Sequence, residues 1–380
     1  MPLRTLIASL LLLVLGCLSS GCTTATAADN TPEAYLVYVG TYGTAGIHCL
    51  RLDMATGKLT KAQDPTPIKN PSFLAIHPNR KFLYAVGEGA GPGVTAFAIQ
   101  KGGTLKQLNQ QTSGGRGPCH IVVDAAGRNV LVANYGGGSC SSIPIGPDGR
   151  LKEPASQIQH AGSSVHPRRQ QKPHAHSINL DAANRFAFVA DLGLDKVLIY
   201  KFDSQTGKLA PNDPPFAKVK PGGGPRHFAF HPSMKYAYTN NELTGSITAF
   251  KYDADKGSLS EIQMISTLPE GFQGRNSTAE IRVHPSGKFL YCSNRGHDSI
   301  AVYSIDQTTG KLTFVEHESV QGKTPRNFNL DPTGTYLLAA NQNSGNIVVF
   351  KIDPATGKLT PTDHQIKVSK PVCLRMIPAE

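Results

Sequence analysis

A short turn motif recurs seven times along the chain and constrains its fold more than any other feature. In each copy a glycine is followed by one residue and then by a leucine, as in Thr56-Gly57-Lys58-Leu59. The leucines lie 46 to 58 residues apart, at Leu59, Leu105, Leu151, Leu209, Leu259, Leu312 and Leu359. A recurrence of this length indicates one supersecondary unit that is repeated seven times.

Each repeat has the pattern of four short strands. In the last full repeat, apolar and β-branched runs at 328–330, 336–340 and 347–352 are separated by turn residues such as Asp331-Pro332-Thr333-Gly334. The chain holds 38 Gly and 27 Pro, many for a helical protein but ordinary for strands and turns. The sequence therefore predicts an all-β fold, a seven-bladed β-propeller with four antiparallel strands in each blade.

The two ends of the repeat array predict how the ring closes. Six repeats have an innermost strand that opens near a turn residue, as at Asn70-Pro71 and Gly117-Pro118, but the first repeat starts directly at Tyr35. The C-terminal segment 370–377 reads as a seventh inner strand without a repeat of its own. We therefore expect it to complete the first blade, which removes an exposed sheet edge.

The N-terminal segment reads as a targeting signal and is excluded from the fold. Arg4 precedes an apolar run over 6–15 that is too short to span a bilayer, and Ala25-Thr26-Ala27 fits a cleavage site. We assign 1–27 to the signal, 28–34 to a linker and 35–380 to one propeller domain. We expect export to the periplasm or beyond the cell. The residues before Cys22, and more weakly those before Cys17, resemble a lipoprotein box, so a lipid anchor to the membrane stays open.

Cysteine usage and charge exclude several classes of function. The five cysteines after Ala27 are widely spaced and odd in number, which argues against a disulfide framework or a zinc site. The net charge of +11 is not concentrated in a basic stripe with interleaved aromatic residues, so we expect no nucleic-acid partner. A positive field favours small anionic ligands instead. We expect a monomer.

Comparing equivalent positions of the repeats separates scaffold from candidate chemistry. Two positions are filled by ordinary turn formers and are interpreted as structural. The first of them carries His77, Asp124, Asp181, His231, His284 and Asp331, and the second, ten residues later, carries Gly87, Asn134, Asp191, Asn241, Asn294 and Asn341. The three histidines of the first set are therefore not taken as a metal site.

At the start of the inner strands and just after the second strands, the repeat pattern breaks into charged residues and histidines. The topology should bring both positions to one mouth of the central channel. The four candidate catalytic residues there are His176, Arg226, Glu242 and Arg295, and the candidate substrate-binding residues are His120, His174, His227, Glu280 and Arg326. The segment 166–172, rich in basic residues, forms either a cationic rim at this mouth or a solvated loop.

This residue set suits an anionic substrate that carries a carbonyl group. Arginine binds carboxylate or phosphate with two parallel hydrogen bonds and can stabilise an oxyanion, and His or Glu can take a proton from water. An alternative is that Arg226 and Glu242 only form an ion pair that braces the channel. A metal held by His174 and His176 with Asp191 or Glu242 is disfavoured because no cluster of carboxylates accompanies them. We expect no metal and no other cofactor.

Four motifs resemble the lactonase family of seven-bladed propellers, which contains bacterial 6-phosphogluconolactonase and fungal carboxy-cis,cis-muconate cyclase. These motifs are the segments 77–84 (HPNRKFLY), 172–176 (KPHAH), 224–227 (GPRH) and 293–299 (SNRGHDS). The resemblance runs from about Tyr35 to the end of the chain. It implies hydrolysis, or the reverse closure, of a lactone with an anionic group and without an obligatory metal. It also implies an active site at His176 or His174, with Arg226, Arg295 and Glu242.

The hypothesis is thus an exported lactone hydrolase that opens an anionic, sugar-type lactone at the channel mouth. Glu242 or His176 would activate water, while Arg226 and Arg295 hold the anion and polarise the carbonyl. The signal segment is unlike the cytosolic enzyme of the family, because 6-phosphogluconolactone is not made outside the cytoplasm. Two alternatives stay open: a non-catalytic exported propeller that binds a carbohydrate or protein, and a lactone-forming enzyme of the cyclase type.

Overall fold

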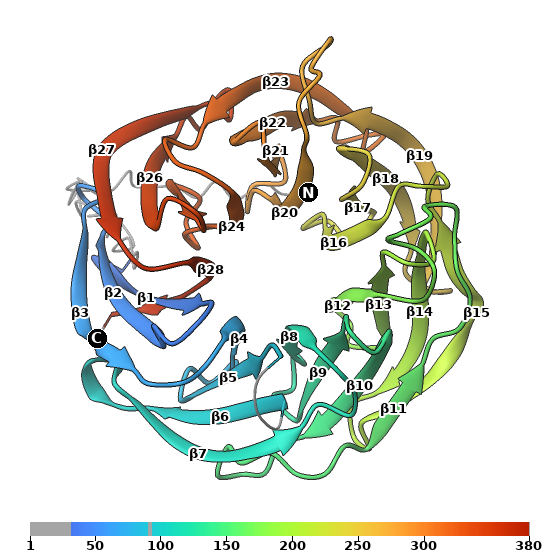
Figure 1. The fold of residues 1–380 in the computed structure, drawn as a ribbon, viewed down its shortest axis with the longest axis horizontal. Coiled ribbons are helices and arrows are strands. Elements are labelled where there is room, and N and C mark those ends of the chain that lie inside the picture. The colour runs from blue at the N-terminus through green and yellow to red at the C-terminus, as the bar shows by residue number, and fades with distance from the viewer. Residues whose placement is uncertain (1–31, 90–92, 380) are drawn as a thin grey trace, which may run out of the picture. The chain divides into compact units, whose positions relative to one another are not determined.

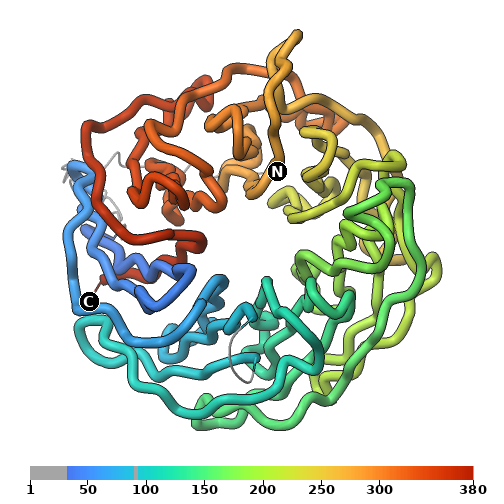
Figure 2. Tube along the Cα trace, viewed as in Figure 1, coloured from blue at the N-terminus to red at the C-terminus, as the bar shows by residue number. Residues whose placement is uncertain are grey.

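The propeller domain in the computed structural model is a ring of seven four-stranded antiparallel sheets, as the repeats predict (Figures 1 and 2). The structure describes residues 32–89 and 93–379. The signal peptide, its cleavage site and both lipoprotein-box cysteines lie outside these residues, as does most of the expected linker. The first strand begins at Ala34, beside the expected domain start at 35.

We number the blades 1 to 7 in chain order and list the strands of each from the channel outwards. Blade 1 contains β28 (Pro371–Pro378), β1 (Ala34–Thr41), β2 (Ile47–Asp53) and β3 (Leu59–Thr66); blade 2 contains β4 (Pro71–Ile76), β5 (Phe82–Gly87), β6 (Gly93–Ile99) and β7 (Leu105–Thr112); blade 3 contains β8 (Pro118–Val123), β9 (Asn129–Asn134), β10 (Ser139–Pro144) and β11 (Ser156–Gln159); blade 4 contains β12 (Ala175–Leu180), β13 (Phe186–Asp191), β14 (Lys196–Asp203) and β15 (Lys208–Lys218). Blade 5 contains β16 (Pro225–Phe230), β17 (Tyr236–Asn241), β18 (Ser246–Asp253) and β19 (Ser258–Ser266); blade 6 contains β20 (Ser277–Val283), β21 (Phe289–Arg295), β22 (Ser299–Ile305) and β23 (Leu312–Ser319); blade 7 contains β24 (Pro325–Leu330), β25 (Tyr336–Asn341), β26 (Asn346–Ile352) and β27 (Leu359–Lys367). One short 3-10 helix, Lys101–Gly103, precedes β7.

The ring closes through the C-terminal strand, which confirms the sequence prediction. Strand β28 pairs antiparallel with β1, so that Tyr35 lies opposite Pro378 and Val39 opposite Leu374. In Figure 1 the red end of the chain therefore lies beside its blue beginning. The strand β1 is buried along its whole length. The first blade is thus assembled from the two ends of the domain.

The hydrophobic core lies between neighbouring blades, where the faces of adjacent sheets pack together. Phe188 of blade 4, for example, stacks on Phe228 of blade 5 with ring centroids 5.5 Å apart, and both side chains are buried. Because every blade has two such faces, each sheet is apolar on both sides. This packing explains why the strands read as nearly continuous apolar runs.

Four of the seven repeated glycine turns, those of Gly103, Gly149, Gly310 and Gly357, are bonded to a tyrosine of a neighbouring blade. The glycine carbonyl accepts a hydrogen bond from a buried tyrosine hydroxyl of the adjacent blade, at 2.9 Å for Tyr238 with Gly310 and for Tyr291 with Gly357. Tyr38 and Tyr84 bond Gly103 and Gly149 in the same way, at 3.0 and 3.1 Å. The sequence repeat therefore marks contacts between blades.

The turn histidines also belong to this scaffold, as predicted. The Nε2 atoms of His77 and His231 lie 2.8 Å from the backbone oxygens of Gly127 and Gly287 in the next blade, and His284 bonds Gly334 at 2.9 Å. The five cysteines after residue 27 are free thiols, and all are buried. Within the described part of the chain, no helix is long and apolar enough to span a membrane.

Candidate active site

All seven inner strands are irregular at the same point, where they enter one mouth of the channel. There the pairing with the second strand slips, in a β-bulge that turns a side chain away from the regular alternation. The side chains at this position are Val372, Ser72, Cys119, His176, Arg226, Ala279 and Arg326, in the order of the blades. Three of these seven residues, His176, Arg226 and Arg326, are candidate site residues from the sequence.

Glu242 is the centre of the charged cluster at this mouth. It follows β17, and its backbone N–H donates to the oxygen of Gly224 at 2.7 Å, which places the side chain beside the start of β16. Its Oε2 accepts hydrogen bonds from Nε of Arg226 at 3.0 Å and from Nη2 of Arg295 at 2.9 Å. Two cationic side chains from blades 5 and 6 thus converge on one carboxylate oxygen.

A third guanidinium reaches the other oxygen of Glu242 from the loop before β12. Nη2 of Arg169 donates to Oε1 at 2.7 Å and to the hydroxyl of Tyr135 at 3.1 Å. The loop is fixed by the buried Gln170, whose amide donates to the oxygen of Leu192 and to Oδ1 of Asp195. Arg169 therefore brings one positive charge of the segment 166–172 to the mouth and is held there rather than mobile, whereas Pro167, Arg168, Gln171 and Lys172 are exposed, as in the solvated-loop interpretation.

The cluster keeps Glu242 ionised. Burial by itself would raise the pKa of this carboxyl group, but the charges of Arg295 and Arg226 outweigh burial and hold the pKa well below its ordinary value. A carboxylate with a strongly lowered pKa is a weak proton acceptor. Glu242 is thus suited to hold guanidinium groups in place.

His176 lies beside this cluster and is neutral at physiological pH. Its Nε2 is 3.9 Å from Oε2 of Glu242, and its Nδ1 is 3.8 Å from Sγ of Cys119. Burial, followed by the charge of Arg226, lowers the pKa of His176 well below 6.5. A neutral imidazole beside fixed cations can accept a proton from water.

His174 takes a different orientation from His176. Its ring stacks on Tyr135 with centroids 4.6 Å apart, and Nδ1 lies 3.0 Å from the backbone oxygen of Tyr135. Asp191 accepts from two backbone N–H groups and lies 2.6 Å from Nδ1 of His160. Among residues 32–89 and 93–379, no three His, Cys, Asp or Glu side chains are grouped as metal ligands.

Three of the predicted substrate-binding residues form a buried layer beneath the mouth. Nδ1 of His227 lies 3.0 Å from Oε1 of Glu280, and Nε2 of His227 lies 3.1 Å from Nη1 of Arg226. Asn327 donates to the second oxygen of Glu280. His120 packs against His227 with ring centroids 5.3 Å apart. This layer supports Arg226 from below.

Arg326 enters the mouth from blade 7, next to blade 6, which carries Arg295. Its guanidinium sits 5.2 Å from the ring of Tyr42, whose hydroxyl donates to Glu88 at 2.8 Å. The three guanidinium groups described above are paired with Glu242, whereas Arg326 forms no ion pair within the described ranges. Arg326 is thus a cation at this mouth that no carboxylate of the described residues is bonded to.

The sequence did not single out Arg169, Tyr135 or Tyr42 as site residues. Tyr135 occupies the same repeat position as Glu242 and Arg295, so the break in the repeat pattern already marked it. Arg169 was noted only as part of a basic loop, because the repeat has no equivalent of that insertion. Its contact with Glu242 could be found only in three dimensions.

Comparison with known proteins places the chain in a family. The model of the family described as "Lactonase, 7-bladed beta-propeller" matches residues 36–376. A Bacillus subtilis 6-phosphogluconolactonase is 39% identical over 302 residues, which cover 78% of this chain and 85% of the relative. A Formosa agariphila 6-phosphogluconolactonase is 36% identical over 75% of this chain and 82% of its own length.

A solved structure gives the same result. The Pseudomonas aeruginosa periplasmic gluconolactonase matches with a TM-score of 0.86 and 32% identity, over 91% of this chain and 100% of the relative. The match extends over all the repeats, and the sequence resemblance noted above is thereby confirmed. The chain belongs to the lactonase family of seven-bladed β-propellers.

Proposed function

We propose that this protein is a lactone hydrolase that acts at the channel mouth around Glu242. The observation that carries the proposal is the pair Arg226 and Arg295, fixed on one carboxylate oxygen beside the neutral His176. The family relatives named 6-phosphogluconolactonase and periplasmic gluconolactonase support the same class of reaction.

In the proposed mechanism, His176 is the general base. It takes a proton from water while the water oxygen attacks the lactone carbonyl carbon, and Arg226 and Arg295 stabilise the oxyanion that forms. The bond between the carbonyl carbon and the ring oxygen then breaks. His176 returns its proton to that oxygen, which leaves a hydroxy acid. A positioned base of this kind contributes roughly 10²–10⁴-fold in rate.

The pKa directions favour His176 over Glu242 as the base. Glu242 is held as a carboxylate of strongly lowered pKa by three arginines, so it has little tendency to bind a further proton. Its proposed role is to fix the orientation of Arg226 and Arg295. Glu242 and His176, the two candidate bases of the sequence hypothesis, thus both take part in the proposed reaction. His176 is the base, and Glu242 orients the arginines.

We assign the anionic group of the substrate to Arg326. It lies on blade 7, beside the blade of Arg295, and forms no ion pair with a carboxylate within the described residues. His174 is proposed to line the entrance, because it stacks on Tyr135 beside Arg169. His120, His227 and Glu280 are proposed to act on the substrate only indirectly, through the position of Arg226.

We further propose that the protein works outside the cytoplasm, on a sugar lactone or another carboxylated lactone. The targeting pattern at residues 1–27 and the periplasmic location stated for the Pseudomonas relative support export. Fractionation of cells that express the full chain, with mass determination of the mature N-terminus, tests both cleavage and lipidation.

The decisive experiment follows lactone opening by the purified protein above the spontaneous rate. We expect hydrolysis of gluconolactone, 6-phosphogluconolactone or a muconolactone that is insensitive to chelator, and its loss in Arg226→Gln. Turnover of none of them by a folded protein would favour the non-catalytic propeller. Net lactone formation from an unsaturated diacid would favour the cyclase alternative.

A further inference from the structure

A closed layer of side chains divides the channel below the active-site mouth. The layer consists of the inner-strand residues directly after the bulge position. Phe73 of blade 2 lies 5.6 Å from His227 of blade 5 and 4.3 Å from His120 of blade 3, measured between ring centroids. All three side chains are buried. Blades 2 and 5 are not neighbours in the ring. The contact between Phe73 and His227 therefore crosses the channel and closes it at this level.

A second space lies on the far side of this layer. Since side chains alternate along a strand, the next channel-facing residues stand two positions further on. They are Ala75, Val122, Asn179, Ala229, Arg282, Asn329 and Arg375, in blades 2 to 7 and then blade 1. Small side chains on blades 2, 3 and 5 leave space, while blades 6 and 1 supply two arginines.

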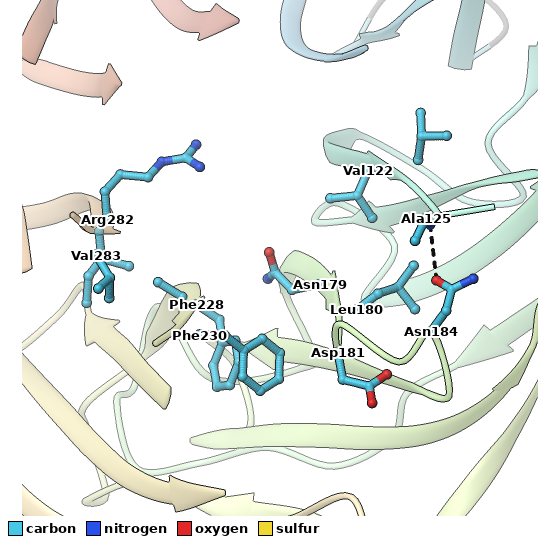
Figure 3. A pocket seen from close by; sticks show the side chains of 13 residues that line it. Val122, Ala125, Asn179, Leu180, Asp181, Asn184, Phe228, Phe230, Arg282 and Val283 are labelled. Carbon is cyan, nitrogen blue, oxygen red and sulfur yellow. Dashed lines mark hydrogen bonds between the residues drawn. The ribbon is translucent and has the colours of Figure 1, made fainter. Parts of the chain in front are cut away.

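A cavity of about 400 Å³ occupies this space on the side of blades 3 to 6. Nine of its 13 lining residues are apolar, among them Val122, Ala229 and Phe230, and the polar ones are Asn179, Asp181, Asn184 and Arg282. In Figure 3, Arg282 extends from its strand toward the space that Asn179 and Val122 also face. We call this cavity the far chamber.

The lining of the far chamber contains one cation, Arg282, and one carboxylate, Asp181. Asp181 already accepts hydrogen bonds from the backbone N–H groups of Arg185 and Phe186 and from the hydroxyl of Tyr252, whereas Arg282 is incompletely bonded. Nε of Arg282 is buried and makes no hydrogen bond within the described residues, and its ion pair with Glu280 is long, at 3.5 Å. The same carboxylate already accepts from Asn327 and pairs with His227. Arg282 therefore has hydrogen-bonding capacity left over.

Arg375 adds a second cation at this level. Its guanidinium lies 4.6 Å from the ring of Phe73, on the layer that closes the channel, and Nη1 donates to the oxygen of Leu374 at 2.7 Å. Burial lowers the pKa of Arg375, and the nearby positive charge of Arg282, which repels that of Arg375, lowers it further. A bound anion would relieve this repulsion.

We propose that the far chamber is a second binding site, distinct from the mouth around Glu242, for a small organic carboxylate. The carboxylate pairs with Arg282, whose guanidinium offers the planar donor geometry that this group prefers. The apolar body of the ligand packs against Val122, Ala229 and Phe230. A cavity of this size, with mostly apolar lining residues and a few polar groups, is typical of small-molecule sites.

Calorimetric titration with benzoate tests the proposal. We expect benzoate to bind the full-length protein, benzyl alcohol not to bind because it lacks the charge, and inorganic phosphate to bind more weakly because it lacks the apolar body. Arg282→Gln should weaken benzoate about tenfold or more, as the loss of a charge-assisted pair does. Arg51→Gln, on the exposed surface, is the matched control for one lost charge and should leave the affinity unchanged.

Two further variants keep the result interpretable. Ala229→Leu fills the chamber without changing charge and should also abolish binding, even if Arg282→Gln folds poorly. Arg326→Gln removes the cation that is proposed above to hold the substrate anion at the mouth, and it should bind benzoate as the unmodified protein does. The proposal is wrong if benzoate does not bind, if phosphate binds as tightly, if binding is kept in both Arg282→Gln and Ala229→Leu, or if it is lost in Arg326→Gln.

Discussion

Arg226 and Glu242 form a buried pair in which Nε of the guanidinium donates to Oε2 of the carboxylate at 3.0 Å. The two side chains are only 3% and 7% exposed. Nη1 of Arg226 faces His227 and the backbone oxygen of Ala279, so this one side chain connects the mouth to the layer beneath it. The orientation of the proposed catalytic cations is therefore fixed before any substrate arrives.

Replacing Glu242 by Gln should cost both activity and stability. The change leaves three arginines facing one another without a counter-charge, and breaking a buried ion pair costs about 3–5 kcal/mol. We expect kcat/KM to fall about 10²-fold or more, as it does when an oxyanion donor is lost, together with a lower Tm. Glu261→Gln, on an exposed strand, is the control and should change neither value.

His176 lies on β12 and His174 in the turn before it, so the effects of replacing the two histidines can be compared directly. His176→Asn should lower kcat about 10²-fold or more, because the proposed base is removed. His174→Asn should act mainly on KM, since that ring stacks on Tyr135 at the entrance. Steady-state kinetics of the two variants, two residues apart, distinguishes the roles. A loss of kcat confined to His174→Asn would reverse the assignment.

Stability should fall as the medium becomes acidic, starting near pH 6.5. Burial lowers the pKa of His120, His176 and His227 well below the ordinary value of 6.5, so the unfolded chain binds protons that the folded protein does not. Above pH 6.5 the three histidines are neutral in both states and do not reduce the free energy of unfolding. As the pH falls from 6.5 toward their lowered pKa values in the folded protein, they reduce it increasingly. Urea unfolding between pH 8 and pH 5 measures this slope, and His227→Asn should make it shallower.

Removing the last strand should prevent the ring from closing. A chain that ends at Ser369 lacks β28 and leaves the buried strand β1 with a free edge. We expect this chain to aggregate or to lose cooperative unfolding in circular dichroism. Deletion of Glu380 alone is the control. A truncated chain that stays monomeric and unfolds at the original temperature would contradict the closure argument.

The tyrosine–glycine contacts between blades should each stabilise the fold by a similar amount. Tyr238→Phe removes one buried hydroxyl bonded to the oxygen of Gly310 and should cost about 1 kcal/mol of unfolding free energy. Tyr84→Phe and Tyr291→Phe test the same contact in two other blades. Chemical denaturation of the three variants should give similar losses with unchanged activity, because none of these residues lies at the mouth.

Much of the fold could be read from the repeats alone. Glycine turns at intervals of 46 to 58 residues implied seven blades, and the missing inner strand before Tyr35 implied that the tail completes the first blade. Both features are local patterns that recur with a fixed period, so they can be recognised without knowledge of any long-range contact. The same comparison marked His176, Arg226, Glu242 and Arg295, because polar residues interrupt positions that the scaffold does not require.

The sequence by itself determined the number of blades, the closure of the ring and the mouth at which the charged residues meet, because these follow from a period and from strand direction. Only the tertiary structure decided which partners each charged residue contacts there. Arg169 enters on an insertion without a counterpart in the repeat, and Glu242 is surrounded by three cations from three separate segments. The division of the channel likewise depends on Phe73 meeting His227 from distant blades. Such pairings are set by the distance across the ring, which no local pattern encodes.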